Sequence, residues 1–235
     1  MRSAAAAANV SVHMGYNKNV AKYVSKVQAF AATAPPGSSV TFVSNNAYES
    51  TPESLGECFE RNSEGMLKNM AIHELALLVS FYDVTVENIE SVVADQEYSS
   101  VQTLAGPDGV SRTDFDKIKF TITTKSGKTV TVAADRCGGT DSYATVNDTA
   151  GAVLYRYDMP DEEDLAHVNA LEKKYPGAMP YFLAQDADYI TVKERVAKFA
   201  AGEAKEAEGI ATIDVAVETL RVAEFLTPEL TKQLQ

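Results

Sequence analysis

Hydrophobic and polar residues repeat with two different periods along this chain. From Tyr16 to Thr33 apolar residues recur at steps of three and four, and Pro35 follows the run. Between Val84 and Tyr157 the period shortens to two, most clearly from Phe115 to Thr124. After Asp161 the longer steps return. Steps of three and four are typical of amphipathic helices, and a period of two is typical of strands with one buried face.

These patterns predict an α+β fold. Helices before and after a run of strands favour an open, mainly antiparallel mixed sheet with helices packed on one face. We expect helices at 16–33, 65–82, 161–175, 188–201 and 213–226, with Pro228 closing the last. We expect strands at 10–15, 40–48, 84–98, 115–124, 129–134 and 152–157, and a loop at 49–64.

Composition excludes several classes of function. Lysine and arginine total 21 and aspartate and glutamate 33, so the formal charge is −12 and nucleic-acid binding is not expected. No apolar run reaches the length of a membrane span, and residues 1–8 have no leucine-rich signal region. Cys58 and Cys137 form no paired motif, so a reducing cytoplasmic or organellar interior is expected rather than secretion.

The strongest candidate for chemistry is His73, one of only three histidines. In a continuous helix from Gly65 to Leu78, Asn69 and His73 lie one turn apart on one face, where both can address one ligand. Histidine titrates near neutrality, so it can move a proton at physiological pH. The alternative is a hydrogen-bonded structural histidine. A zinc motif would need a second histidine where Leu77 stands, so no metal site is expected.

Two further segments are candidates for a substrate site. Tyr16, Asn17 and Lys18 follow a strand–glycine junction, where a helix start and a lysine can bind an anionic or hydroxylated ligand. The alternative is an ordinary helix start with Lys18 in solvent. Asp135 and Arg136 end a strand just before two glycines, and they fit either the rim of a site or a solvated turn.

The sequence contains no dinucleotide-binding fingerprint. No Gly-x-Gly-x-x-Gly follows a strand, and no phosphate-binding Gly-x-x-x-x-Gly-Lys-Ser/Thr loop is present. The only adjacent glycines, Gly138 and Gly139, lie among strands rather than at the start of a helix. This chain alone is therefore not expected to hold a dinucleotide in the usual way.

Three segments resemble, in the right order, the Gfo/Idh/MocA oxidoreductases, the glucose–fructose oxidoreductase and inositol dehydrogenase family. They are the Val-His-Met-Gly-Tyr-Asn-Lys run at 12–18, the 65–78 helix and the closing 210–226 helix. The resemblance implies an NAD(P)-dependent enzyme with an N-terminal Rossmann domain and a C-terminal α/β domain. That second domain carries the substrate site and often oligomerises through its sheet.

The resemblance also implies how the chain divides. The whole of 1–235 is expected to be one α/β domain. Residues 1–12 are a remnant of the junction with the cofactor domain, and residues 13–235 form the C-terminal substrate and oligomerisation domain. The family's glycine-rich fingerprint and its Glu-Lys-Pro motif with the catalytic lysine would precede residue 1. A truncated gene model, a cleaved product and a reduced subunit are all compatible with this.

Individual roles follow from the resemblance by position. His73 matches the family's catalytic histidine, and Asn69 stands where several members have an aspartate. Lys18 falls where members often carry a basic residue near the substrate, and Asp135 and Arg136 are weaker candidates for the rim.

The expected function is therefore a substrate domain of an oxidoreductase acting on a sugar, polyol or similar small molecule. NAD or NADP would be held by a domain outside this chain, so the chain would be inactive alone. It would form a homo-oligomer through the open sheet face, or bind a partner protein there. The alternative is a non-catalytic structural or binding subunit derived from the same family, and a separate cofactor-domain chain that restores activity on mixing is a third possibility.

Overall fold

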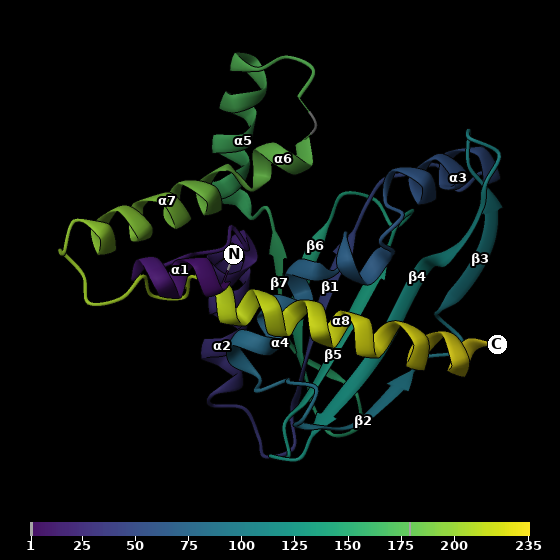
Figure 1. Cartoon of the computed structure of the whole chain (residues 1–235), viewed down its shortest axis with the longest axis horizontal. Helices are drawn as coiled ribbons and strands as arrows, with labels where there is room; N and C mark the ends of the chain where they lie inside the picture. Colours follow the sequence, from purple (N-terminus) through teal and green to yellow (C-terminus); the bar gives the residue numbers. More distant parts are fainter. Residues whose placement is uncertain (1, 179) are drawn as a thin grey trace.

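A computed structural model describes residues 2–178 and 180–235, and a seven-stranded sheet is its centre (Figure 1). The strand order is β2-β4-β5-β1-β6-β7, with β3 paired to β4 beside this path. The β1–β5 pair is parallel and the other pairs are antiparallel, so the predicted mainly antiparallel mixed sheet is confirmed. The strands are β1 (Ser39–Asn45), β2 (Ile89–Ala94), β3 (Ser100–Ala105), β4 (Ser111–Thr124), β5 (Thr129–Asp135), β6 (Ser142–Asn147) and β7 (Val153–Met159).

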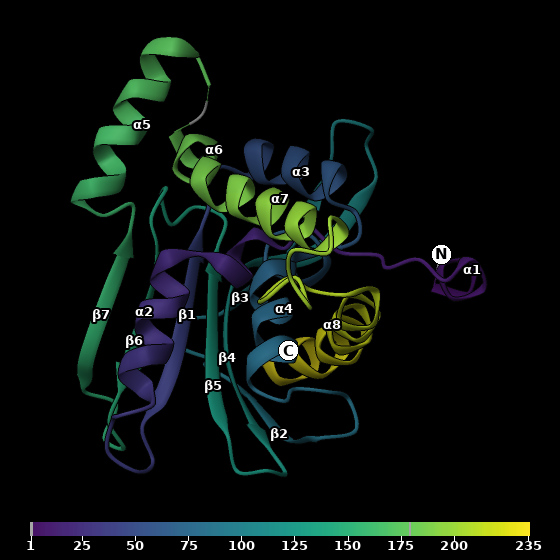
Figure 2. The ribbon, with the colours of Figure 1, turned by 90° about the vertical axis from the view of Figure 1, so that its left-hand side faces the viewer.

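Helices cover one face of this sheet. Figure 2 shows α2, α4 and α8 on the same side of the strands, whereas α5 projects beyond the end of β7. The helices are α1 (Arg2–Ala8), α2 (Lys22–Ala31), α3 (Pro52–Arg61), α4 (Ile72–Phe81), α5 (Glu162–Lys174), α6 (Pro180–Ala184), α7 (Asp186–Ala200) and α8 (Ile213–Leu234), and the 3₁₀ helices are η1 (Asn17–Val20) and η2 (Met66–Lys68).

The hydrophobic core lies between the sheet and these helices. Alternate residues of β4, namely Ile118, Phe120 and Ile122, are buried there as the period of two predicts. From the helices, Leu75 of α4 and Leu226 of α8 pack into the same cluster. Burial of such side chains is the main stabilising contribution to the fold, worth about 1.5–3 kcal/mol each.

The other face of the sheet carries no helix within the described residues. Thr121, Thr131 and Thr145 lie on it, and Val93 and Val153 at its two sides are 61% and 58% exposed. None of the described helices combines the length and apolar character that a bilayer-spanning segment needs.

The predicted loop at 49–64 is wrong, because most of it forms α3. Thr51 caps this helix by accepting a hydrogen bond from the Ser54 N–H at 3.2 Å, and Pro52 occupies its first turn. Leu55 and Phe59 provide its buried face. The Thr-Pro start was therefore an available helix signal that the polar composition concealed.

The predicted continuous helix from Gly65 to Leu78 is also wrong. Residues 66–68 form η2, and the backbone at Asn69 then leaves helical geometry with φ −112° and ψ −83°. Helix α4 begins only at Ile72. The apolar residues on both sides of the break pack into the same core, so the sequence shows one uninterrupted apolar pattern.

Two smaller predictions need correction. The expected strand at 10–15 is a single antiparallel bridge between His13 and Thr212. Pro228 lies inside α8 instead of closing it. The Thr227 hydroxyl donates to the Ala223 carbonyl at 2.8 Å, and the helix continues to Leu234.

Replacing Gly56 with alanine should destabilise the fold. A Cβ at this position would lie 2.3 Å from the Ala105 carbonyl oxygen, where α3 crosses the end of β3. We expect Gly56→Ala to lower the free energy of unfolding by about 1–3 kcal/mol in a urea titration, although alanine is the better helix former. Gly15→Ala is the control, since its Cβ would meet no atom within 4 Å. Equal midpoints for the two variants would contradict the close packing of α3.

Candidate functional site

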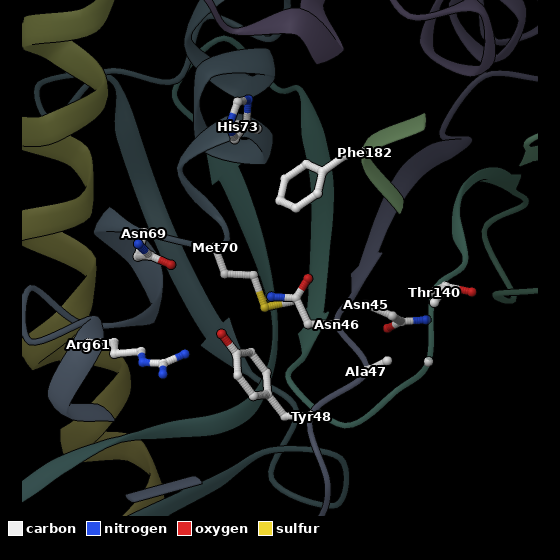
Figure 3. Close-up of a pocket in the computed structure, with 11 residues that line it drawn as sticks. Asn45, Asn46, Ala47, Tyr48, Arg61, Asn69, Met70, His73, Thr140 and Phe182 are labelled. Carbon is white, nitrogen blue, oxygen red and sulfur yellow. The ribbon is translucent and has the colours of Figure 1, made fainter. Parts of the chain in front are cut away.

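A pocket of ≈ 390 Å³ opens beyond the C-terminal end of β1. Its walls come from that strand end, from α3, from the η2–α4 junction, from the β5–β6 loop and from α6 (Figure 3). Chain segments far apart in sequence therefore meet there. The lining residues are Asn45, Asn46, Ala47, Tyr48, Arg61, Asn69, Met70, His73, Gly139, Thr140 and Phe182.

His73 borders this pocket from the first turn of α4. Its ring packs edge-to-face on Tyr16, with the ring centroids 5.6 Å apart. Burial, together with the nearby Lys18 charge, lowers the pKa of His73 to about 4, although Glu74 opposes the shift. The imidazole is therefore neutral at pH 7, and a neutral imidazole can accept a proton or a hydrogen bond.

Lys18 and Glu74 form a buried ion pair next to His73. The side chains are 1% and 0% exposed. The ammonium group of Lys18 also donates to the Ser44 hydroxyl at 3.0 Å, so the pair joins η1, α4 and β1. This position corrects the alternative of a solvated Lys18. Lys18 is not among the residues that line the pocket. Its charge therefore affects the site indirectly, through its ion pair with Glu74 and its electrostatic effect on His73.

A second cluster of buried polar residues lies on the other side of η1. The Asn17 amide donates to Gln185 at 2.9 Å, and Asn17 also contacts Asp188 near the start of α7. Burial, reinforced by Asp164, raises the pKa of Asp188 to about 7. Asn17 is fully buried, so it supports the site from behind rather than lining it.

Buried polar atoms without hydrogen-bond partners gather in this region. They include His73 Nδ1, Glu74 Oε2, Asn17 Oδ1 and Asp188 Oδ2. Such atoms are uncommon in folded proteins, because leaving them unpaired costs about 1–3 kcal/mol each. These residues belong to the two buried polar groups on either side of η1.

Asn69 and His73 both line the pocket, but the helical geometry predicted for them is wrong. The expected one-turn spacing within a helix does not exist, since Asn69 follows η2 and precedes α4. The bend at Asn69 leaves its side chain exposed on the same rim as His73. Figure 3 shows the two residues on one wall.

Arg136 lies in the interior and Asp135 is the last residue of β5, and neither of them lines the pocket. The Arg136 guanidinium donates to the Phe115 carbonyl at 3.2 Å, to Cys58 Sγ at 2.9 Å and to Asp114 at 2.7 Å. Asp135 accepts a hydrogen bond from the Cys137 N–H at 2.8 Å. Arg136 therefore stabilises the fold, because its donors are already engaged.

Sequence reasoning missed most of the remaining lining residues. Asn45 is the last residue of the largely buried strand β1 and Asn46 follows it, and such a polar pair at a strand end is a usable indication of a site. No local pattern points to Arg61, Thr140 or Phe182. These residues are brought to the pocket only by the tertiary fold.

The part of the chain that the structure describes meets the requirements of neither a metal site nor a dinucleotide site. Within residues 2–178 and 180–235, no group of three or more histidine, cysteine or acidic side chains is placed to hold a metal ion. The described sheet contains one parallel strand pair rather than the consecutive parallel strands that form a dinucleotide crevice. The described residues therefore do not fit a dinucleotide by themselves.

The buried ion pair can be tested by removing its members separately and together. We expect Lys18→Met to lower the free energy of unfolding by about 3–5 kcal/mol, because it leaves the Glu74 carboxylate buried and uncompensated. The double variant with Glu74→Leu should regain most of that loss, since both charges are then absent.

Urea unfolding of the two variants measures this difference. Lys68→Met is the matched control, because Lys68 pairs with Glu224 at the partly exposed surface and should cost less than about 1 kcal/mol. A Lys18→Met variant as stable as this control would contradict a structural role for the pair.

Solved structures of dehydrogenases share this fold, whereas no family model and no curated protein matches the chain's sequence. A putative myo-inositol dehydrogenase from Sinorhizobium meliloti has a TM-score of 0.61 at 14% identity, over 98% of this chain and 65% of that one. Scyllo-inositol dehydrogenase from Lactobacillus casei has a TM-score of 0.61 at 12% identity, over 95% of this chain and 63% of that one. An aldose–aldose oxidoreductase from Caulobacter crescentus has a TM-score of 0.54 at 14% identity, over 99% and 64%.

The chain thus spans 63% to 65% of the length of these structures. At these identities the likeness establishes the fold. It confirms that the chain resembles, in its architecture, the C-terminal α/β domain of the Gfo/Idh/MocA oxidoreductases.

Proposed function

We propose that this chain is the substrate-binding domain of an NAD(P)-dependent oxidoreductase that acts on a sugar, polyol or similar hydroxylated molecule. One observation carries the proposal: His73 lies, neutral at pH 7, on the wall of a pocket rich in amide side chains. The pocket belongs to a fold shared with inositol and sugar dehydrogenases. A volume of ≈ 390 Å³ lies within the range of small-molecule sites.

The lining residues suit a polyhydroxylated ligand. The side chains of Asn45, Asn46 and Asn69 each offer both donors and an acceptor, which is what a ring of hydroxyl groups requires. In oxidation of an alcohol, the neutral His73 would accept the hydroxyl proton as the carbonyl forms. Asn69 would orient the substrate, because an amide cannot take up that proton.

A hydride acceptor is the remaining requirement. The resemblance implies NAD or NADP, and the described residues do not fit such a group, so it would be held by a domain or chain beyond these 235 residues. The contribution of this chain is then to bind and orient the substrate and to hold the proton acceptor. As an isolated chain it would be inactive.

The sheet face that carries no described helix is a candidate surface for association between chains. The resemblance implies association through this face, and Val93 and Val153 are exposed on it beside Tyr98 and Tyr143. We propose that a second copy of the chain covers the face.

The second candidate function is a non-catalytic binding or structural subunit with the same fold. It is favoured by the absence of a dinucleotide crevice from the described sheet. The two candidates differ in the pocket: only the substrate domain needs polyol binding that depends on His73.

Ligand titrations of the purified chain test the proposed function. We expect myo-inositol and glucose to shift amide NMR signals of the pocket residues, and NADH and NADPH to give no saturable fluorescence enhancement. His73→Gln should weaken polyol binding about two- to tenfold, which is the usual effect of losing one hydrogen bond.

His167→Gln is the matched control, because His167 lies on α5 and pairs with Asp186 outside the pocket. Tight, saturable NADH binding would contradict the assignment of the cofactor to another domain. Absence of polyol binding would contradict the substrate site and favour the non-catalytic subunit.

A further inference from the structure

Arg61 is the charged exception in a pocket that is otherwise neutral. Of the described residues that line it, none is a carboxylate, and His73 is uncharged at pH 7. Three asparagines and Thr140 supply neutral polar groups. The whole chain has a formal charge of −12, so a cation without a lining carboxylate marks this pocket apart from the general surface.

The position of Arg61 leaves its guanidinium available to a ligand. Arg61 ends α3 and pairs with Glu57 one turn earlier, and the two side chains are 69% and 48% exposed. Exposed pairs of this kind contribute only about 0.3–0.5 kcal/mol. An incoming anion can therefore replace Glu57 at little cost. Alternatively, Glu57 stays paired and the anion binds to the guanidinium donors that Glu57 does not use.

A purely structural role of Arg61 explains its position less well than a ligand-binding role does. A basic residue in the last turn is favourable at any helix C-terminus, but it does not require the side chain to reach a pocket. Figure 3 shows the Arg61 guanidinium directed toward Tyr48 and the space in front of it. Arg136, which donates to three protein groups in the interior, illustrates the structural alternative in the same molecule.

We propose that the substrate of this site carries an oxyanion, a carboxylate or a phosphate, and that Arg61 binds it. The substrate class is then an acidic hydroxylated compound, such as a sugar acid or a sugar phosphate. This inference rests on the proposed function, which supplies the hydroxylated part of the substrate. Guanidinium groups bind both kinds of oxyanion through paired hydrogen bonds.

The positions of His73 and Arg61 at opposite ends of the pocket determine how the substrate would be oriented. In Figure 3, His73 lies at one end and Arg61 with Tyr48 at the other, with Asn69 between them. The hydroxyl group presented to His73 therefore lies away from the oxyanion on Arg61. Asn69 and Asn46 lie between these two ends, where their amides would bind the remaining hydroxyl groups of the substrate.

Three sugars that share a ring test the proposal. Dissociation constants of the purified chain for glucose, glucuronate and glucose 6-phosphate are measured by calorimetry or NMR at constant ionic strength. We expect at least one of the two acidic sugars to bind about tenfold more tightly than glucose or tighter still, in line with one charge-assisted contact. The better of the two identifies carboxylate or phosphate as the group that Arg61 binds.

Arg61→Gln should weaken binding of the acidic sugars more than binding of glucose, so that the preference is lost, and Arg61→Lys should retain part of the preference. Lys68→Gln, which removes the same charge outside the pocket, should keep the preference intact. Equal binding of all three sugars, or a preference that survives Arg61→Gln, would overturn this inference while leaving the proposed function standing. If no sugar binds at all, the proposed function fails together with it.

Discussion

The buried pair of Lys18 and Glu74 is the interaction on which the rest of the site depends. Moving two charges out of water costs several kcal/mol per ion, so the pair persists only where its geometry and hydrogen bonds compensate. Ser44 supplies one of those hydrogen bonds from β1. The pair thereby fixes η1 and α4 against the sheet, and it places a positive charge behind His73.

The position of His73 follows from that constraint. A histidine that loses solvent and faces an ammonium group stays neutral at physiological pH. Its protonated form is also unfavourable in the folded state, so folding stability is lost as the pH falls from about 6.5 toward 4. The same features therefore keep the imidazole in its proton-accepting form and limit how strong a base it can be.

The described residues meet the requirements for substrate binding but not those for dinucleotide binding. The pocket wall, the neutral histidine and the amide side chains all come from the described residues. A dinucleotide needs a parallel sheet with a glycine-rich crossover, and the described residues do not form one. The two sets of requirements are physically separable, because substrate recognition needs converging side chains and pyrophosphate binding needs a particular backbone turn.

Much of the fold was predictable from the sequence, because the second half of β4 alternates between buried and partly exposed residues and α5 begins with an acidic capping box. The break at Asn69 was not, since residues on both sides of it are apolar and pack into one core. His73 was identified from its rarity and its neighbours. Arg61 was not identified, because nothing local distinguishes it from any solvated helix terminus.

The roles of Lys18 and Arg136 illustrate the same limit. Both are basic residues next to polar sequence, which is how solvated or substrate-binding residues also look. Only the fold brings Glu74 to Lys18 and Asp114 to Arg136, at sequence separations of 56 and 22 residues. Burial of a paired charge is a tertiary property, so a single sequence does not reveal it.

The pKa of His73 is the most direct test of this account. Imidazole resonances of the folded chain can be followed by NMR from pH 3.5 to 8, with His13→Gln and His167→Gln variants used for assignment. A titration midpoint of about 4 is the predicted result, and it means a neutral imidazole held next to the buried pair. A midpoint at or above 6.5, the value for a solvated histidine, would contradict the account.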